Sequence, residues 1–102
     1  MQKEIENKIE DVKRLCSTLG VSRLYVFGSA TTKNFNEDSD VDFLISFDEN
    51  LTIEEYTNNF FLLHEELNKL FGRHIDLITE RTLSNPYFIK SVNETKQLIY
   101  EV

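Results

Sequence analysis

The sequence contains few of the residues that mark disorder, long linkers or disulfides. Among its 102 residues are three glycines, one proline and one cysteine. So little glycine and proline argues against low complexity or a long disordered linker. A single cysteine excludes an internal disulfide and fits a reducing compartment. With 40% hydrophobic residues the chain can bury one modest core, so we expect a single domain over residues 1–102.

Long apolar runs are also missing, both at the start of the chain and further along it. A membrane-spanning helix needs about 20 predominantly apolar residues. A secretory signal needs a shorter apolar stretch after a basic start. The sequence encodes neither, so we expect a cytoplasmic protein that does not contact a membrane.

Positive charge is scarce and scattered. Eleven Lys and Arg residues stand against 18 Asp and Glu, which gives a net charge of -7. A chain without a basic patch has no electrostatic footprint for holding a nucleic-acid backbone. This disfavours a template-copying polymerase and direct binding of long nucleic acid. A protein side chain, a small molecule or an RNA end brought by another subunit remain as acceptors for any group transfer.

The most informative pattern is a glycine-serine turn followed at a fixed distance by two carboxylates. Gly28 and Ser29 end one apolar segment, and ten residues later Asp40 and Asp42 open the next. Such a turn can offer backbone N–H groups and a hydroxyl to phosphate oxygens. Carboxylates two apart on a strand point to the same side and can share metal ions. The combination suits nucleotidyl transfer with Mg²⁺.

A third carboxylate, Asp76, lies inside a later apolar run, 75–79. An acid there is costly to bury unless it is paired or binds a cation. A lone Asp-x-Asp is often only a solvated strand edge. The Gly-Ser turn before it and Asp76 after it favour a shared metal site instead.

Periodicity predicts three helices and four extended segments. Apolar residues at three- and four-residue steps indicate a helix that ends at Gly20 and a long one that opens with the capping box at 52–55 and ends at Gly72. Asn85 and Pro86 begin a short third helix. The predicted stripes are Ile5, Ile9, Val12, Leu15, Cys16 and Leu19 in the first helix, and Ile53, Tyr56, Phe60, Leu63, Leu67, Leu70 and Phe71 in the second.

Strands are expected at 22–27, 40–47 and 73–79, and a strand or extended tail at 97–100. Alternation in the second places its apolar residues opposite Asp40 and Asp42, so that one face packs on helices and the other lines an open site. A short link between the first two strands favours an adjacent antiparallel pair. The fold class is therefore α/β with a small mixed sheet and flanking helices; the strand order does not follow from the sequence.

Several other reactive or aromatic side chains have simpler interpretations. Cys16 lies on an apolar stripe and is a core residue rather than a nucleophile. His64 is expected to be solvated. His74 shares the strand parity of Asp76 and can approach the metal site, although an exposed or structural role is favoured. The off-stripe Phe61 and Leu62, with Tyr87 and Phe88, exceed what one core needs and predict a partner surface.

The Gly-Ser-x10-Asp-x-Asp pattern with a later strand Asp resembles the DNA polymerase β-type nucleotidyltransferase superfamily. The length and the closing segments, 75–83 and 99–101, resemble its minimal nucleotidyltransferase (MNT) branch, over about residues 24–101. The resemblance implies a polymerase β palm-like fold that uses Mg²⁺ and a nucleoside triphosphate. Many members carry an Arg and a Gly soon after Gly-Ser, whereas this chain has Ala30-Thr-Thr-Lys33.

Carried over by position, the resemblance assigns Gly28 and Ser29 to the triphosphate and Asp40, Asp42 and Asp76 to the metal. Asp76 would also accept the proton of the attacking hydroxyl. MNT domains are often paired with HEPN-domain toxins, which implies transfer of AMP from ATP to a tyrosine of such a partner. Two alternatives remain: a non-catalytic antitoxin that neutralises its partner by covering it, and modification of a small molecule. The oligomeric state is open.

Overall fold

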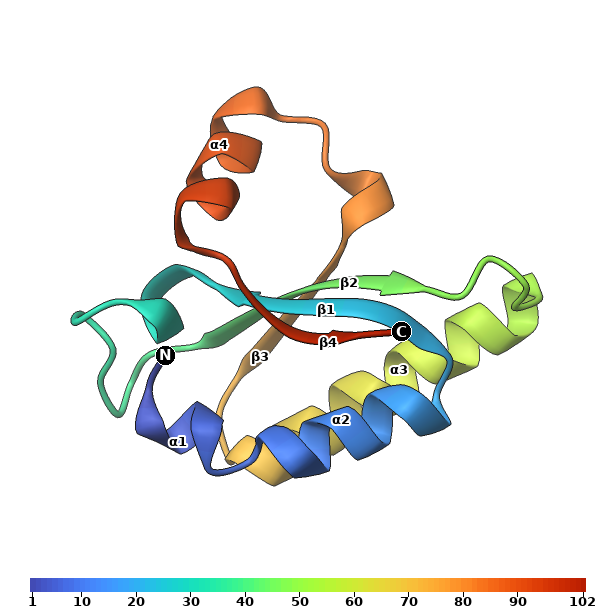
Figure 1. The fold of residues 1–102 in the computed structure, drawn as a ribbon, viewed down its shortest axis with the longest axis horizontal. Coiled ribbons are helices and arrows are strands. Elements are labelled where there is room, and N and C mark those ends of the chain that lie inside the picture. The colour runs from blue at the N-terminus through green and yellow to red at the C-terminus, as the bar shows by residue number, and fades with distance from the viewer.

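A four-stranded mixed sheet forms the centre of the computed structural model, which describes the whole chain from Met1 to Val102. Helices lie on both of its faces (Figure 1). The chain runs through α1 Lys3–Glu6, α2 Ile9–Thr18, β1 Val21–Phe27, η1 Gly28–Thr31, β2 Val41–Phe47, α3 Ile53–Phe71, β3 Ile75–Thr79, η2 Glu80–Thr82, α4 Pro86–Thr95 and β4 Gln97–Glu101, where η marks a 3-10 helix. The predicted α/β class with a small mixed sheet is confirmed.

The order of the strands in the sheet is β3-β2-β1-β4. β1 pairs antiparallel with both β2 and β4, as the short link between the first two strands predicted. β2 and β3 run parallel, and the long helix α3 makes the crossover between them that a parallel pair requires. Consequently the C-terminal end of β1 and the N-terminal ends of β2 and β3 meet at one end of the sheet.

The main core lies between the sheet and the pair α2 and α3. Alternate residues of β2 are buried against these helices, as the strand pattern predicted. Cys16 is fully buried in the same core, and burial raises the pKa of its thiol to about 12. It is a core residue, as expected, and its thiol stays protonated. The buried β2 residues on this side are Val41, Phe43, Ile45 and Phe47.

The opposite face of the sheet is covered in part by α4 (Figure 1). Phe27, Leu44 and Val92 form a second, smaller buried cluster there. The ring of Phe88 meets that of Phe27 edge-on at 6.0 Å between centroids. The expectation that this face lines an open site was therefore incomplete, because α4 covers the part of the face around Leu44.

The long helix begins and ends where the sequence predicted. Thr52 and Glu55 form both hydrogen bonds of a capping box. Gly72 ends the helix with φ +62°. The predicted stripe is wrong at Ile53, whose side chain is 87% exposed, because the first turn of α3 extends past the end of the sheet.

The first helix is not continuous, contrary to the prediction. α1 ends at Glu6, and α2 begins at Ile9 after Lys8 adopts φ -113° and ψ 5°. The Lys8 ammonium donates to the Leu70 carbonyl near the end of α3. This contact joins the break between α1 and α2 to the end of α3.

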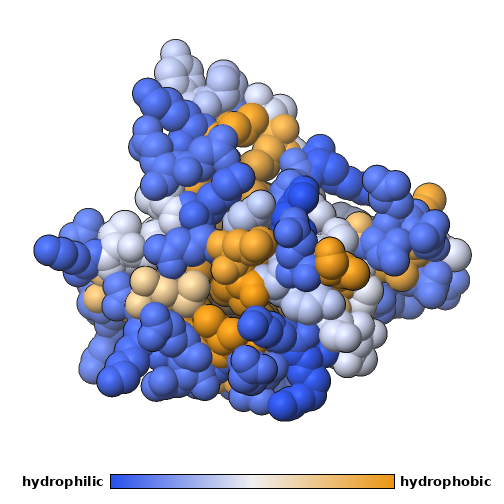
Figure 2. Space-filling view, in the orientation of Figure 1, coloured by the Kyte–Doolittle hydropathy of each residue, from blue (hydrophilic) through white to orange (hydrophobic).

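Hydrophilic side chains cover most of the visible surface, and hydrophobic ones gather at its middle, around the edge strand β4 (Figure 2). Leu98 of β4 is among the exposed apolar residues. No helix combines the length and the apolar composition that crossing a membrane requires.

Candidate active site

The three predicted acids meet at the end of the sheet that contains the C-terminal end of β1 and the N-terminal ends of β2 and β3. Asp40 directly precedes β2, and Asp42 is the second residue of that strand. Asp76 is the second residue of β3 and pairs in register with Asp42. Parallel pairing therefore places the carboxylates of Asp42 and Asp76 side by side, although the two residues are 34 positions apart in sequence.

Asp42 experiences the strongest electrostatic effect of the three. Its partial burial raises its pKa to about 6, and hydrogen bonding to Asp76 and the charges of Asp76 and Asp40 act in the same direction. None of the ion pairs in the structure joins a Lys or Arg to these acids. The cluster thus carries excess negative charge and consists of oxygen donors, which fits a divalent cation.

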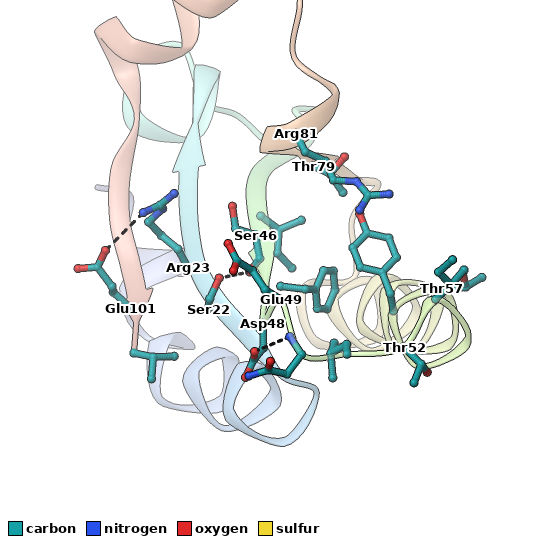
Figure 3. A pocket seen from close by; sticks show the side chains of 17 residues that line it. Ser22, Arg23, Ser46, Asp48, Glu49, Thr52, Thr57, Thr79, Arg81 and Glu101 are labelled. Carbon is teal, nitrogen blue, oxygen red and sulfur yellow. Dashed lines mark hydrogen bonds and ion pairs between the residues drawn. The ribbon is translucent and has the colours of Figure 1, made fainter.

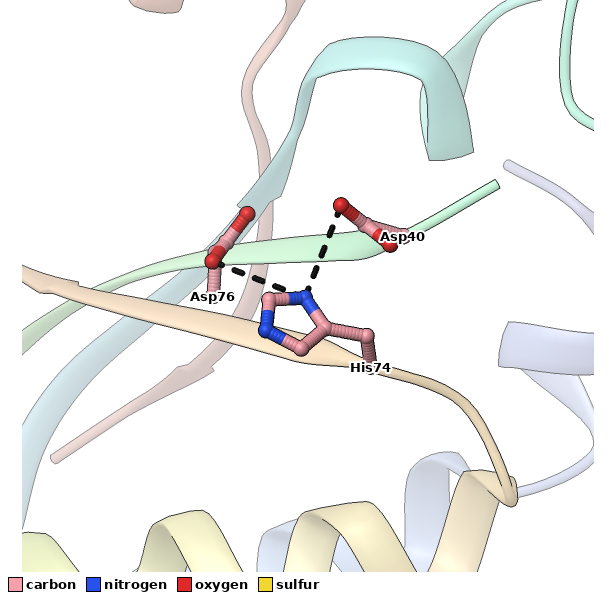
Figure 4. Close-up of side chains that lie close together, drawn as sticks. All are labelled: Asp40, His74 and Asp76. Atoms are coloured by element: carbon pink, nitrogen blue, oxygen red, sulfur yellow. Dashed lines mark ion pairs between the residues drawn. The ribbon is translucent and has the colours of Figure 1, made fainter. Parts of the chain in front are cut away.

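His74 is exposed, as the favoured interpretation from sequence expected, and it also lies beside the acids, which was the other possibility. Its Nδ1 is 3.5 Å from Asp40 Oδ2 and 3.7 Å from Asp76 Oδ1 (Figure 4). The imidazole remains exposed to solvent. The ligand atoms of Asp40, His74 and Asp76 all lie within 4.8 Å of one another. Strand parity with Asp76 was the signal in the sequence that pointed to this position.

The backbone turn at Gly28 lies directly against the Asp42 carboxylate. Its φ is +72°, a conformation that residues with a Cβ rarely adopt. A Cβ at this position would lie 2.7 Å from Asp42 Oδ2. The N–H of Gly28 donates to Thr95 Oγ1 at the end of α4, 2.9 Å away. Glycine is thus required here to let the Asp42 carboxylate approach the turn.

The loop between the Gly-Ser turn and Asp40 is held by a residue that sequence reasoning missed. Arg73 donates through Nη1 to the backbone carbonyls of Asn36, Glu37 and Ser39, at 2.7 to 3.0 Å. It also forms a bidentate ion pair with Glu4, and its side chain is only 12% exposed. No feature of the neighbouring sequence indicates this role of Arg73, because all four partners lie more than 30 residues away in sequence.

Ser29 is half-buried and Lys33 is exposed on the loop.

His64 was expected to be solvated, and this was wrong. Its Nε2 lies 2.8 Å from the Ile75 carbonyl oxygen, and its Nδ1 lies 3.3 Å from Asn68 Nδ2. Asn68 Oδ1 accepts from the Ile75 N–H. The charged neighbours of His64 suggested solvent, but the side chain faces the start of β3 and fixes it to α3.

A cavity of about 870 Å³ lies at the opposite end of the sheet (Figure 3). Its polar side chains bind mostly to one another or to neighbouring backbone. Arg23 forms a bidentate pair with Glu80 and approaches Glu101, and Ser22 donates to the Ser46 carbonyl. None of the three acids lines it. The candidate active site is therefore the acidic end of the sheet rather than this cavity.

The raised pKa of Asp42 predicts how the metal-free protein responds to pH. In the unfolded chain this pKa is near 3.8 and in the fold it is about 6. The folded state therefore binds the proton more tightly, so its contribution to stability falls as the pH rises from about 4 to about 7. We expect Asp42→Asn to be more stable than wild type by about 1 kcal/mol at pH 8, after discounting for solvent screening, and equal near pH 3. Urea unfolding in EDTA across this range measures the difference; a difference independent of pH would contradict the coupling.

Comparison with known proteins identifies relatives over most of the chain. The model of the family described as Nucleotidyltransferase domain matches residues 5–99. A Methanocaldococcus jannaschii protein, named provisionally as a protein adenylyltransferase, is 39% identical over 82 residues. The match covers 78% of this chain and 76% of that protein.

Solved structures share the fold. One, described provisionally as a minimal nucleotidyltransferase, superposes with a TM-score of 0.67 at 30% identity and covers 91% of this chain and 90% of its own. Another contains a tri-AMPylated Shewanella oneidensis HEPN toxin in complex with MNT antitoxin. Its matching chain has a TM-score of 0.65 at 15% identity, with 95% of this chain and 72% of that chain covered. At 15% identity the second match shows a shared fold alone.

Proposed function

The chain belongs to the nucleotidyltransferase domain family, and we propose that it transfers AMP from ATP to a hydroxyl group of a protein partner with the help of Mg²⁺. The observation that carries this proposal is the meeting of three carboxylates from β2, its preceding loop and β3 directly beside the Gly28 turn. The M. jannaschii relative supports adenylyl transfer to protein by its name. Residues 1–102 would act as one domain.

In this proposal Asp40, Asp42 and Asp76 hold the metal. Their excess negative charge, with no Lys or Arg paired to it, would repel a triphosphate in the absence of cations. A bound Mg²⁺ would neutralise phosphate oxygens and favour ionisation of the acceptor hydroxyl. The three carboxylates would thereby serve as metal ligands in catalysis.

The chain's own groups supply orientation and a proton acceptor. The acceptor oxygen forms a bond to the α-phosphorus of ATP, the bond from that phosphorus to the β-phosphate bridge breaks, and pyrophosphate leaves. Asp76 takes the proton released from the hydroxyl. The Ser29 hydroxyl would donate to the triphosphate. Gly28, without a side chain, leaves room for the Asp42 carboxylate and would let phosphate approach the backbone of the turn closely.

We further propose that the acceptor is a tyrosine of a HEPN-type toxin and that the chain acts as its antitoxin in the cytoplasm. The solved complex of an AMPylated HEPN toxin with an MNT antitoxin, which shares this fold, supports that choice. A net charge of -7 disfavours direct recognition of long nucleic acid by this domain.

The exposed apolar residues named from the sequence do not form one surface. Phe61 and Leu62 lie on α3, below the sheet in Figure 1, whereas Tyr87 and Phe88 lie on α4, above it. Asp42 shares its face of the sheet with Leu44, which α4 covers. A partner that presents its hydroxyl to Asp42 therefore approaches the α4 side.

Tyr87→Asp is expected to reduce labelling of the partner at least tenfold without changing the melting temperature, because this side chain is 85% exposed and makes no core contact. Phe61→Asp is the matched control, since Phe61 is 65% exposed on the other side of the sheet. Quantitative co-purification and label transfer compare the two. The α4 assignment is wrong if Phe61→Asp alone weakens the partner complex.

The function itself is tested by co-expressing the chain with a HEPN-type protein and supplying α-labelled ATP with Mg²⁺. The expected result is stable label on a tyrosine of the partner and none when the label is on the γ-phosphate. Label from the γ-phosphate alone would indicate phosphoryl transfer, label from both positions would indicate bound ATP, and label from neither would refute adenylyl transfer to this partner.

A non-catalytic antitoxin that covers its partner remains the second candidate. It is favoured by the loop after Ser29, where Ala30 is buried and Lys33 is the nearest cation in sequence. Without an Arg in this loop, fewer positive charges neutralise a triphosphate. Neutralisation of the partner that persists when ATP is withheld would support covering over chemistry.

A further inference from the structure

We infer that His74 joins Asp40 and Asp76 in a mixed nitrogen and oxygen donor set that binds a divalent transition metal, such as Mn²⁺ or Co²⁺, more tightly than Mg²⁺. The inference rests on the proposed function and concerns the ion that its site prefers. It arises from the imidazole, which the prediction of a purely carboxylate site did not include.

The distance from His74 to each of the two carboxylates suits ligands of one ion. Ligand atoms about 2.1 Å from an ion lie ~3.0 Å apart at a right angle and ~4.2 Å apart on opposite sides. The His74 Nδ1 is 3.5 Å from Asp40 Oδ2 and 3.7 Å from Asp76 Oδ1, both within this interval. Figure 4 shows the imidazole directed toward both carboxylates, of which Asp40 directly precedes β2 and Asp76 belongs to β3.

The backbone fixes His74 at this place. Its carbonyl accepts from the Val41 N–H at 3.1 Å, between Asp40 and Asp42. One residue earlier, Arg73 is held by Glu4 and by the loop that leads to Asp40. The backbone of His74 is therefore anchored next to the acids, while its imidazole side chain is 64% exposed to solvent.

The type of donor decides the preferred ion. Mg²⁺ favours oxygen ligands and retains several waters, whereas imidazole nitrogen binds first-row transition metals more strongly. Replacing one oxygen donor by nitrogen should therefore leave Mg²⁺ affinity nearly unchanged and raise affinity for Mn²⁺ and, further along the series, Co²⁺. Selectivity would depend on His74, while the carboxylates bind every ion.

The test measures metal binding to the whole chain without ATP or partner. Mn²⁺ titration by electron paramagnetic resonance, Co²⁺ titration by visible absorption and Mg²⁺ titration by calorimetry are compared for wild type, His74→Gln and His64→Gln. His64 is the only other histidine and is bound to the Ile75 carbonyl, away from the acids. We expect His74→Gln to lose at least tenfold in affinity for Mn²⁺ and Co²⁺ and less than twofold for Mg²⁺.

A direct readout does not depend on a variant that could fold differently. Pulsed electron paramagnetic resonance of Mn²⁺-loaded wild type should show coupling to an imidazole nitrogen, and this coupling should vanish in His74→Gln. Absence of nitrogen coupling in wild type, or equal losses for all three ions, overturns the inference. If Mg²⁺ binds and AMP transfer proceeds while His74→Gln changes neither metal preference nor coupling, the inference fails and the proposed function stands. If no divalent ion binds at all, both fail.

Discussion

Asp40→Asn combined with Asp42→Asn is expected to abolish AMP transfer while the fold remains intact. Asn keeps the size of Asp and one oxygen, but it removes the charge that holds a divalent ion. Loss of several kcal/mol of charge stabilisation corresponds to about a thousandfold or more in rate. The variant should melt at the same temperature as wild type or higher without metal, because it no longer buries the charge of Asp42 next to Asp40 and Asp76, and that burial and repulsion raise the pKa of Asp42.

The matched control is Glu37→Gln with Asp38→Asn, two exposed acids of the same loop. This control removes the same charge a few residues away and should keep transfer near wild type. Label on the partner at wild-type level from the Asp40 and Asp42 variant would contradict the catalytic assignment. If partner neutralisation is lost together with label, the enzyme is favoured, and if neutralisation survives without label, the covering antitoxin is favoured.

Gly28→Ala is expected to reduce stability by about 3 kcal/mol and to reduce AMP transfer at least a hundredfold. The positive φ alone costs roughly 1–2 kcal/mol for a residue with a Cβ. The new methyl group would also lie 2.7 Å from Asp42 Oδ2, so the carboxylate must move away from its place beside Asp76. Displacement of a catalytic group by even about 1 Å can cost a hundredfold in rate.

Gly72→Ala separates the cost of the positive φ from the cost of the contact with Asp42. Gly72 has a similar φ of +62°, and a Cβ there would meet nothing within 4 Å. This control should lose only about 1 kcal/mol and retain transfer. Urea unfolding and the label-transfer assay measure both variants. Equal losses of stability and activity at the two glycines would show that contact with Asp42 is unimportant.

Short-range chemistry made much of the fold predictable. The capping box at Thr52 and Glu55 and the glycine at position 72 defined the long helix, because each acts through neighbours within a turn. Alternation along β2 placed Asp42 opposite the buried residues Phe43 and Ile45. Such features depend on periods of two to four residues, which a sequence displays directly.

Long-range contacts explain what was missed. The break near Lys8 depends on α3, and the loop before Asp40 depends on Arg73, whose partners lie more than 30 residues away. The contact of Gly28 with Asp42 and the parallel register of Asp42 with Asp76 exist only once the sheet has formed. The sequence predicted which acids could cooperate and that His74 could approach them, but not its contacts with both Asp40 and Asp76.

Calorimetric titration of the wild-type chain with ATP, in the presence and in the absence of Mg²⁺, measures whether the carboxylates of Asp40, Asp42 and Asp76 form one site that binds a nucleotide only through a divalent ion. We expect saturable binding with Mg²⁺ and at least tenfold weaker binding when EDTA removes it, since three uncompensated carboxylates repel the triphosphate. Equal affinity under both conditions, or no binding under either, would contradict this expectation.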